Sequence, residues 1–305
     1  MAVCTMLLMM ACTGQKGTAQ GESGAKDSLA ADTAFSASDT LVFKDVVYQD
    51  SLPYKVKIVD YSGDEEPYPY TVETVADTWE VNTLWAVGGP AEAMAFVNQW
   101  LTLDAAGEDS YSVHTAAEVA KAYEELKKEG ITDVRSALKN RWGEHQPDDD
   151  IDEDEMESMA FKSANEYSSS ISVMWQTKNL LTLWDSGYDY SAGAAHGMPW
   201  GAAKTFDLKN LRILTLEDII MENGKQAVLK MIFDQLKDEY ADVWDMANDA
   251  SDFPGTDPAL DKDGVRFDYG AYELGAYAMG MPCAVIPYEK IKKYLTPEVK
   301  ELLGL

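Results

Sequence analysis

Apolar and polar residues alternate in several short segments of this chain, a pattern that predicts β-strands with one buried face. Residues 41–48 and 54–61 alternate and are rich in β-branched side chains. Residues 166–177 and 180–190 alternate in the same way, and the pair Lys178–Asn179 between them suits a tight turn. We therefore expect two strands near the start of the structured region and a β-hairpin in its second half.

Other segments repeat apolar residues at the spacing of a helix. The clearest begins at Thr115, because Thr115 and Glu118 form a capping-box pattern and apolar residues then recur at helical intervals. Residues 90–101, 134–142 and 225–240 show similar spacing. We expect a helix in each of these segments.

The predicted strands and helices do not alternate regularly along the chain. Further strands are predicted over residues 200–208, 265–269 and 281–286, the last of which carries Cys283 as a small core residue. Residues 71–87 have no clear period and stay ambiguous. Grouped strands without strict β-α-β order are typical of the α+β class, so we expect antiparallel sheets packed by helices.

An acidic run over residues 148–155 separates two halves with different patterns. We interpret this run as a solvated linker between two small domains. Residues 41–150 form the predicted N-terminal companion α+β domain, and residues 151–305 form the C-terminal α+β domain.

The N-terminus has the features of an export signal. Residues 1–11 are apolar and uncharged, and a small residue, Ala11, directly precedes Cys12, which resembles the lipobox of bacterial lipoproteins. On this interpretation residues 1–11 are a signal peptide, Cys12 carries lipid, and residues 12–40 are a flexible tether of small polar residues. The protein would then be exported and anchored to the bacterial membrane only through that lipid; the alternative is a soluble protein with an apolar N-terminus.

The net charge narrows the choice of partners. The 305 residues include 53 acidic and 25 basic ones, for a formal charge of −28. Such a surface repels the phosphates of nucleic acid and anionic lipid headgroups, so neither is an expected partner. It attracts basic proteins, although acidity also serves solubility alone.

Four segments of the second half carry a family resemblance. They are 190–197 (Tyr-Ser-Ala-Gly-Ala-Ala-His-Gly), 205–209 (Thr-Phe-Asp-Leu-Lys), 214–219 (Leu-Thr-Leu-Glu-Asp-Ile) and 269–280 (Tyr-Gly-Ala-Tyr-Glu-Leu-Gly-Ala-Tyr-Ala-Met-Gly). In this order they resemble the domain of unknown function found in the RsiV anti-sigma factor and beside the catalytic domain of PdaC-type peptidoglycan deacetylases. Ala194 stands where that family has a second glycine.

The resemblance implies a cell-envelope protein, and one member of the family is a sensor that binds lysozyme. It implies no activity, because no catalytic deacetylase domain accompanies these segments in the chain. The partner that it suggests is a glycan or a basic envelope-acting protein such as lysozyme.

Few residues point to chemistry. The 3 histidines are not paired with each other or with cysteine at metal-ligand spacing, and no nucleotide-binding or nucleophile motif occurs, so we expect no metal and no cofactor. His196 lies in a loop of small residues near Tyr190 and Trp200, and Tyr272 and Tyr277 belong to the last family segment. We take these five residues as candidate ligand-binding residues; the alternative is that they serve only turns and packing.

The sequence therefore predicts a non-catalytic cell-envelope lipoprotein that binds or senses a glycan or a cationic protein. The alternative is a cell-wall or polysaccharide hydrolase. Its catalytic carboxylates cannot be chosen from the sequence, since acidic residues are so numerous.

Overall fold

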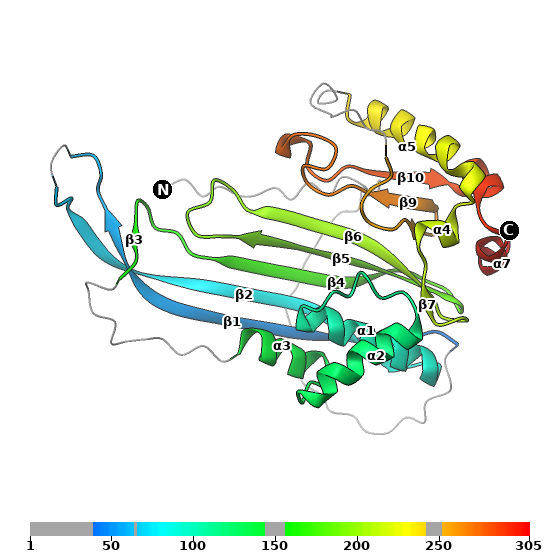
Figure 1. The fold of residues 1–305 in the computed structure, drawn as a ribbon, viewed down its shortest axis with the longest axis horizontal. Helices are drawn as coiled ribbons and strands as arrows, with labels where there is room; N and C mark the ends of the chain where they lie inside the picture. The colour runs from blue at the N-terminus through cyan, green and yellow to red at the C-terminus, as the bar shows by residue number, and fades with distance from the viewer. Residues whose placement is uncertain (1–38, 64–65, 144–155, 242–251) are drawn as a thin grey trace, which may run out of the picture.

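The computed structural model describes residues 39–63, 66–143, 156–241 and 252–305. A seven-stranded sheet with the strand order β3-β1-β2-β4-β5-β6-β7 forms its base (Figure 1). The strands are β1 (Val42–Val59), β2 (Tyr70–Gly88), β3 (Ser158–Met159), β4 (Glu166–Gln176), β5 (Leu180–Tyr190), β6 (Met198–Asp207) and β7 (Arg212–Ile213). The α+β prediction is confirmed.

Strands from both halves of the chain belong to this one sheet. β1 and β2 pair antiparallel over their whole length, and β2 pairs parallel with β4, from Thr78 opposite Glu166 to Asn82 opposite Ser170. The predicted β4–β5 hairpin is confirmed as an antiparallel pair. The acidic run at which we placed the domain boundary, residues 148–155, lies outside the described residues.

The two strands expected before residue 61 are one strand, so that prediction is wrong. β1 continues through Ser51–Pro53 because β2 pairs with it without interruption there, for example Leu52 opposite Asp77. Pro53 is tolerated because β1 lies near the edge of the sheet, where a missing backbone donor costs little. The ambiguous residues 71–87 belong to β2, in which the neighbours Thr83 and Leu84 are both buried, on opposite faces.

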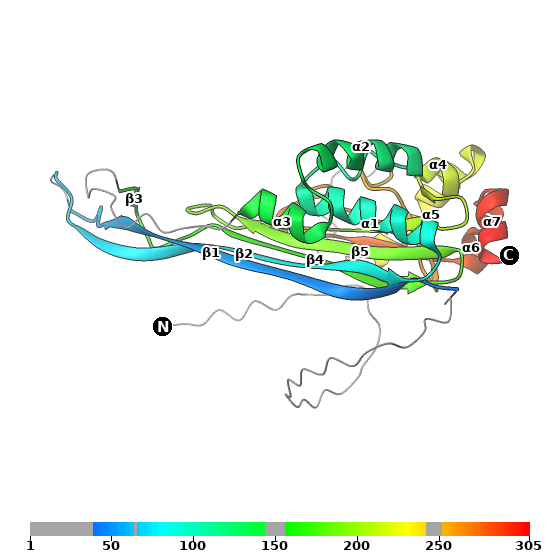
Figure 2. The ribbon, with the colours of Figure 1, turned by 90° about the horizontal axis from the view of Figure 1, so that it is seen from below.

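Three helices cover one face of the sheet (Figure 2). They are α1 (Ala91–Ala106), α2 (Ala116–Lys128) and α3 (Val134–Trp142). The Thr115–Glu118 capping box is confirmed, since Thr115 Oγ1 accepts from the Glu118 backbone and the Glu118 carboxylate accepts from the Thr115 backbone. Trp100 of α1 packs edge-to-face on Phe206 of β6, with ring centroids 5.1 Å apart.

A second layer packs on β5 and β6 from the other side. It contains a three-stranded sheet, in the order β10-β9-β8, and further helices. Leu181 and Leu183 belong to the core under α1, whereas Leu180 belongs to the second core and Thr182 donates a hydrogen bond of 2.6 Å to the backbone oxygen of Leu260. Because side chains alternate along a strand, β5 is covered on both faces.

The elements of this second layer are β8 (Ala259–Leu260), β9 (Gly264–Asp268), β10 (Cys283–Pro287), α4 (Leu216–Ile219), α5 (Lys225–Glu239), α6 (Tyr288–Ile291), α7 (Pro297–Leu303) and the 3₁₀ turns Glu222–Gly224, Tyr277–Met279 and Lys292–Tyr294. The predicted helix over residues 225–240 is α5. Cys283 is buried at the start of β10, as expected.

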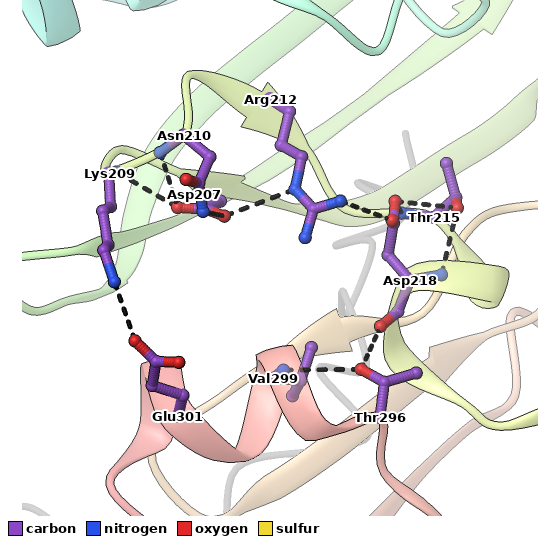
Figure 3. A network of polar contacts seen from close by, with 9 residues as sticks. All are labelled: Asp207, Lys209, Asn210, Arg212, Thr215, Asp218, Thr296, Val299 and Glu301. Carbon is purple, nitrogen blue, oxygen red and sulfur yellow. Dashed lines mark hydrogen bonds and ion pairs between the residues drawn. The ribbon is translucent and has the colours of Figure 1, made fainter.

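Two of the family segments meet in a polar network (Figure 3). The Asp207 carboxylate is fully buried and accepts hydrogen bonds from the backbones of Lys209 and Asn210, from the Asn210 side chain and from Arg212. Arg212 also donates to Asp218 at 2.7 Å. Thr296, at the start of α7, donates to the Asp218 backbone oxygen at 2.5 Å. These segments therefore have a structural role: they fix the turn after β6 to α4 and α7.

Residues 1–38 lie outside the described residues. They include Cys12, the predicted signal peptide and nearly all of the predicted tether. Among the described helices, none has both the length and the apolar character needed to cross a membrane.

Candidate ligand-binding sites

The fold brings three of the predicted ligand-binding residues together: His196, Tyr272 and Tyr277, which we call the aromatic cluster. The Tyr272 hydroxyl lies 2.9 Å from His196 Nε2. The Tyr277 ring stacks on the imidazole, with centroids 4.0 Å apart and planes 25° apart. His196 Nδ1 lies 3.1 Å from the Gly197 carbonyl, which can only accept, so in this contact Nδ1 carries the proton and a neutral imidazole accepts from Tyr272.

Tyr272 holds an unusual backbone conformation for its residue type. Its φ is 68°, in the left-handed region, where an aromatic residue is strained by roughly 1–2 kcal/mol. The neighbouring Glu273 carboxylate accepts hydrogen bonds of 2.6 Å from the backbone N–H groups of Gly255 and Gly270. These contacts fix the loop, and the Tyr272 side chain stays 46% exposed beside the imidazole.

The other two candidate residues lie elsewhere. The Tyr190 hydroxyl lies 3.0 Å from Ser163 Oγ and donates to the backbone oxygen of Ala194, so it closes its own loop. Trp200 lies opposite Gly187 across β5 and β6 and faces the helices. It lines a cavity that we did not predict.

This cavity, which we call the Asp185 cavity, lies between the sheet and the ends of α1 and α3. Its volume is about 250 Å³. Its polar walls include Thr83, Asp104, Glu108, Ser110, Tyr111, Arg141 and Asp185. Its apolar and aromatic walls include Val81, Leu138, Tyr167, Ile171 and Trp200.

Asp185 is the least exposed of the charged residues that line the cavity. Asp185 is only 3% exposed, and its Oδ2 accepts a hydrogen bond of 2.9 Å from the Tyr111 hydroxyl. Its Oδ1 and the buried hydroxyl of Thr83 have no hydrogen-bond partner within the part of the chain that the structure describes. Buried polar atoms without partners are rare in native proteins, so these two need an explanation.

The electrostatics of the cavity favour uncharged carboxyl groups. Burial raises the pKa of Asp185 well above its usual range, and the nearby Asp104 carboxylate raises it further. Burial also raises the pKa of Asp104, whose Oδ1 accepts from Ser110 at 3.0 Å. Burial also lowers the pKa of Lys204 of β6, whose ammonium lies 4.3 Å from the centre of the Tyr111 ring.

Arg141 lies at the exposed rim of the cavity. Its guanidinium carbon is 4.7 Å from the ring centre of Trp142 and 5.4 Å from that of Tyr167, so two aromatic faces hold it. Gly107 ends α1 with a φ of 78°, and a Cβ there would approach the guanidinium carbon to 3.0 Å. The positive φ favours glycine at this position, and a side chain there would displace the guanidinium of Arg141.

The sequence contained one sign of this cavity. Leu181 and Leu183 face the helices, and alternation along β5 places Asp185 on the same face. A carboxylate on the buried face of a strand indicates a polar site, but its partners Asp104 and Tyr111 come from α1 and the following loop. In the described ranges, no three His, Cys, Asp or Glu side chains are arranged to hold a metal ion.

Comparison with known proteins connects the chain to a family without an assigned function. A family model described as "Protein of unknown function (DUF3298)" matches residues 217–289. This range includes Tyr272 and Tyr277 and overlaps the last two segments that carried the resemblance. Comparison with curated proteins gave no match.

Two solved structures are similar to the chain. A DUF3298 family member from Bacteroides fragilis NCTC 9343 has 24% sequence identity and a TM-score of 0.55, and the alignment covers 87% of this chain and 98% of that one. A DUF3298 family protein from Pseudomonas aeruginosa PAO1 has 17% sequence identity and a TM-score of 0.48, and the alignment covers 85% of this chain and 96% of that one. At such identity the first likeness supports the fold alone.

Proposed function

We propose that this protein is a cell-envelope lipoprotein of the RsiV-like type that binds or senses a glycan without catalysis, through the aromatic cluster. The observation that carries the proposal is the exposed Tyr272 ring, held by the imidazole of His196 despite a strained backbone. Strain of this kind persists where the surrounding structure maintains it, often at functional sites. An aromatic ring offers a flat face to the C–H groups of a sugar, and an adjacent imidazole hydrogen-bonds sugar hydroxyls.

The first experiment measures binding of a soluble peptidoglycan disaccharide by the domain without its N-terminal segment. Tyr272→Ala removes the ring and should abolish detectable binding by calorimetry. Tyr272→Phe keeps the ring but loses the hydrogen bond to His196, so affinity should fall severalfold only. Tyr61→Ala is the matched control, because Tyr61 is similarly exposed at 55%. Equal binding by all four proteins would refute a glycan site at the aromatic cluster.

A cationic envelope-acting protein is the other partner that we propose, with lysozyme as the case to test. The formal charge of −28 supports fast encounter with such a partner. Binding should weaken steeply as salt rises from low to physiological ionic strength. Salt-independent affinity for lysozyme, or none, would remove this partner.

Export and lipid anchoring at Cys12 are part of the proposal. Metabolic labelling with a fatty-acid analogue should mark the wild-type protein and leave Cys12→Ala unlabelled. Cys4→Ala is the control, because it changes the other N-terminal cysteine and should keep the label. An unlabelled wild type in the cytosolic fraction would contradict the anchor.

A hydrolase remains the second candidate, favoured by one observation. Asp104 and Asp185 line one cavity and both have raised pKa values, as general acids do. A hydrolase would release soluble fragments from peptidoglycan, and Asp104→Asn or Asp185→Asn would stop the release. A binding protein leaves the polymer intact.

A further inference from the structure

We propose that the Asp185 cavity is a second binding site, specific for a small zwitterion such as an amino acid or a dipeptide. Asp185 would bind the ammonium group in the depth of the cavity, and Arg141 would bind the carboxylate at its rim. This site lies apart from the aromatic cluster, since none of the cluster's residues lines the cavity. The inference therefore goes beyond the glycan-binding function proposed above.

Two buried oxygens of the cavity are available to the hydrogen-bond donors of a ligand. Asp185 Oδ1 and Thr83 Oγ1 are buried, and neither has a partner among the residues that the structure describes. An ammonium group carries three N–H donors and no acceptor, so it can supply the hydrogen bond that Asp185 Oδ1 lacks. Tyr111 donates to the other carboxylate oxygen of Asp185, Oδ2, and Oδ1 is left for a ligand.

The charges of the walls favour a cation over a neutral hydroxyl at this depth. Asp104, Glu108 and Asp185 line the cavity, against the single guanidinium of Arg141. The ammonium of Lys204 lies against the Tyr111 ring and makes no ion pair shorter than 4 Å within the described ranges. A bound ammonium would therefore stabilise the ionised forms of Asp185 and Asp104, which burial otherwise disfavours.

Arg141 supplies the complementary group at the opening. Two aromatic rings and the glycine-bounded end of α1 fix its guanidinium. A fixed planar guanidinium suits bidentate binding of a carboxylate better than a flexible lysine does. An α-amino acid presents an ammonium and a carboxylate, the two groups that Asp185 and Arg141 would bind.

The size and the remaining walls limit the ligand further. A volume of about 250 Å³ lies below the roughly 300–1,000 Å³ of pockets that hold drug-sized molecules. Val81, Leu138 and Ile171 form apolar walls that accept an aliphatic side chain. We therefore expect aliphatic amino acids and short dipeptides to bind, and charged side chains to bind more weakly.

The test uses leucine and two fragments of it as probes, measured by calorimetry on the domain. Isopentylamine lacks the carboxylate, and 4-methylpentanoate lacks the amine; each should bind at least about tenfold more weakly than leucine, because each loses one charge-assisted contact. Glucose is the neutral control; it is measured on the Tyr272→Ala domain, in which the proposed glycan site is removed, and should not bind. Binding of glucose here, or binding of none among leucine, other aliphatic amino acids and their dipeptides, would overturn the proposal.

Two variants assign the anchors. Asp185→Asn should weaken leucine and isopentylamine alike, whereas Arg141→Gln should weaken leucine but leave isopentylamine unchanged. Asp234→Asn and Arg135→Gln are matched controls at exposed positions of α5 and α3. If Asp185→Asn does not fold, Arg141→Gln still decides, since Arg141 is exposed. Unchanged leucine affinity in Arg141→Gln refutes the assignment.

Proton release provides an independent readout. Because the empty site favours a protonated Asp185, an ammonium ligand should displace that proton, and affinity should fall as the pH is lowered. The ionisable groups around Asp185 in the cavity are Asp104 of α1, Glu108, Tyr111, Tyr167 of β4, Arg141 of α3 and Lys204 of β6. Calorimetry in buffers of different ionisation enthalpy measures the released proton. Tyr272→Ala should leave leucine binding unchanged, which separates this proposal from the glycan site.

Discussion

Tyr111 donates a hydrogen bond of 2.9 Å to Asp185 Oδ2, although the two residues lie 74 positions apart in the chain. Tyr111 belongs to the loop after α1, and Asp185 lies on the helix-facing side of β5. The contact ties the loop to the sheet and shapes one wall of the Asp185 cavity. Among the described residues, no side chain other than that of Tyr111 donates a hydrogen bond to the Asp185 carboxyl group.

Tyr111→Phe should therefore destabilise the protein. The variant keeps the ring and removes the donor, so Asp185 loses its phenol partner; we expect the free energy of unfolding to fall by about 1–3 kcal/mol. Urea denaturation at neutral pH measures this change. Tyr61→Phe, at an exposed ring, should change the free energy little, and equal effects from the two variants would contradict the role given to the Tyr111 contact.

The stability of the protein should depend on pH through Asp185. Its pKa is raised in the folded protein, whereas in the unfolded chain it lies near about 3.9, so between these values the folded state binds more protons. Stability from this group is thus present at low pH and lost as the pH rises through that window. Asp185→Asn removes the ionisation.

The free energy of unfolding of Asp185→Asn, relative to that of the wild type, should therefore increase as the pH rises from about 4 towards neutrality. Urea titrations of both proteins at several pH values give this difference. Parallel pH curves would show that Asp185 does not titrate as described. Asp234→Asn is the control, because Asp234 is exposed and should leave the pH curve unchanged.

The polar network of Figure 3 predicts a large difference between two neighbouring substitutions. Asp207→Ala removes a fully buried carboxylate, so the Arg212 guanidinium and the backbone N–H groups of Lys209 and Asn210 lose this acceptor. We therefore expect the free energy of unfolding to fall by about 3–5 kcal/mol. Lys209→Ala removes only an exposed ion pair with Glu301 and should have little effect. Thermal and urea denaturation compare the two, and a mild effect of Asp207→Ala would reject the network as a structural support.

Gly187→Ala should be strongly destabilising for a steric reason. A Cβ at Gly187 would lie 2.3 Å from the Ser168 backbone oxygen and 2.4 Å from the Trp200 ring. Since the backbone oxygen cannot move away alone, we expect a cost of about 1–3 kcal/mol or more and a displaced Trp200, seen as a change in tryptophan fluorescence. Gly63→Ala is the matched control, because no atom lies within 4 Å of its Cβ position; similar stability of the two variants would contradict this packing.

Part of the candidate site was accessible from the sequence. His196 was chosen for its loop of small residues, and Tyr272 and Tyr277 were chosen as tyrosines of the last family segment; the structure places the three in contact. Tyr190 and Trp200 were chosen for proximity in sequence to His196, and they lie in other surroundings. Closeness in sequence did not predict a shared site, because Tyr190 and Trp200 belong to β5 and β6, whereas His196 lies in the loop between these strands.

The sequence by itself determined the local elements: the capped start of α2 at Thr115, the β4–β5 hairpin and the α5 helix. These depend on interactions between residues a few positions apart, so periodicity and caps suffice. Only the tertiary structure decided that β2 pairs parallel with β4 and that Asp185 meets Tyr111 under α1. Such contacts join distant segments through the packing of whole faces, and no local pattern encodes which faces will meet.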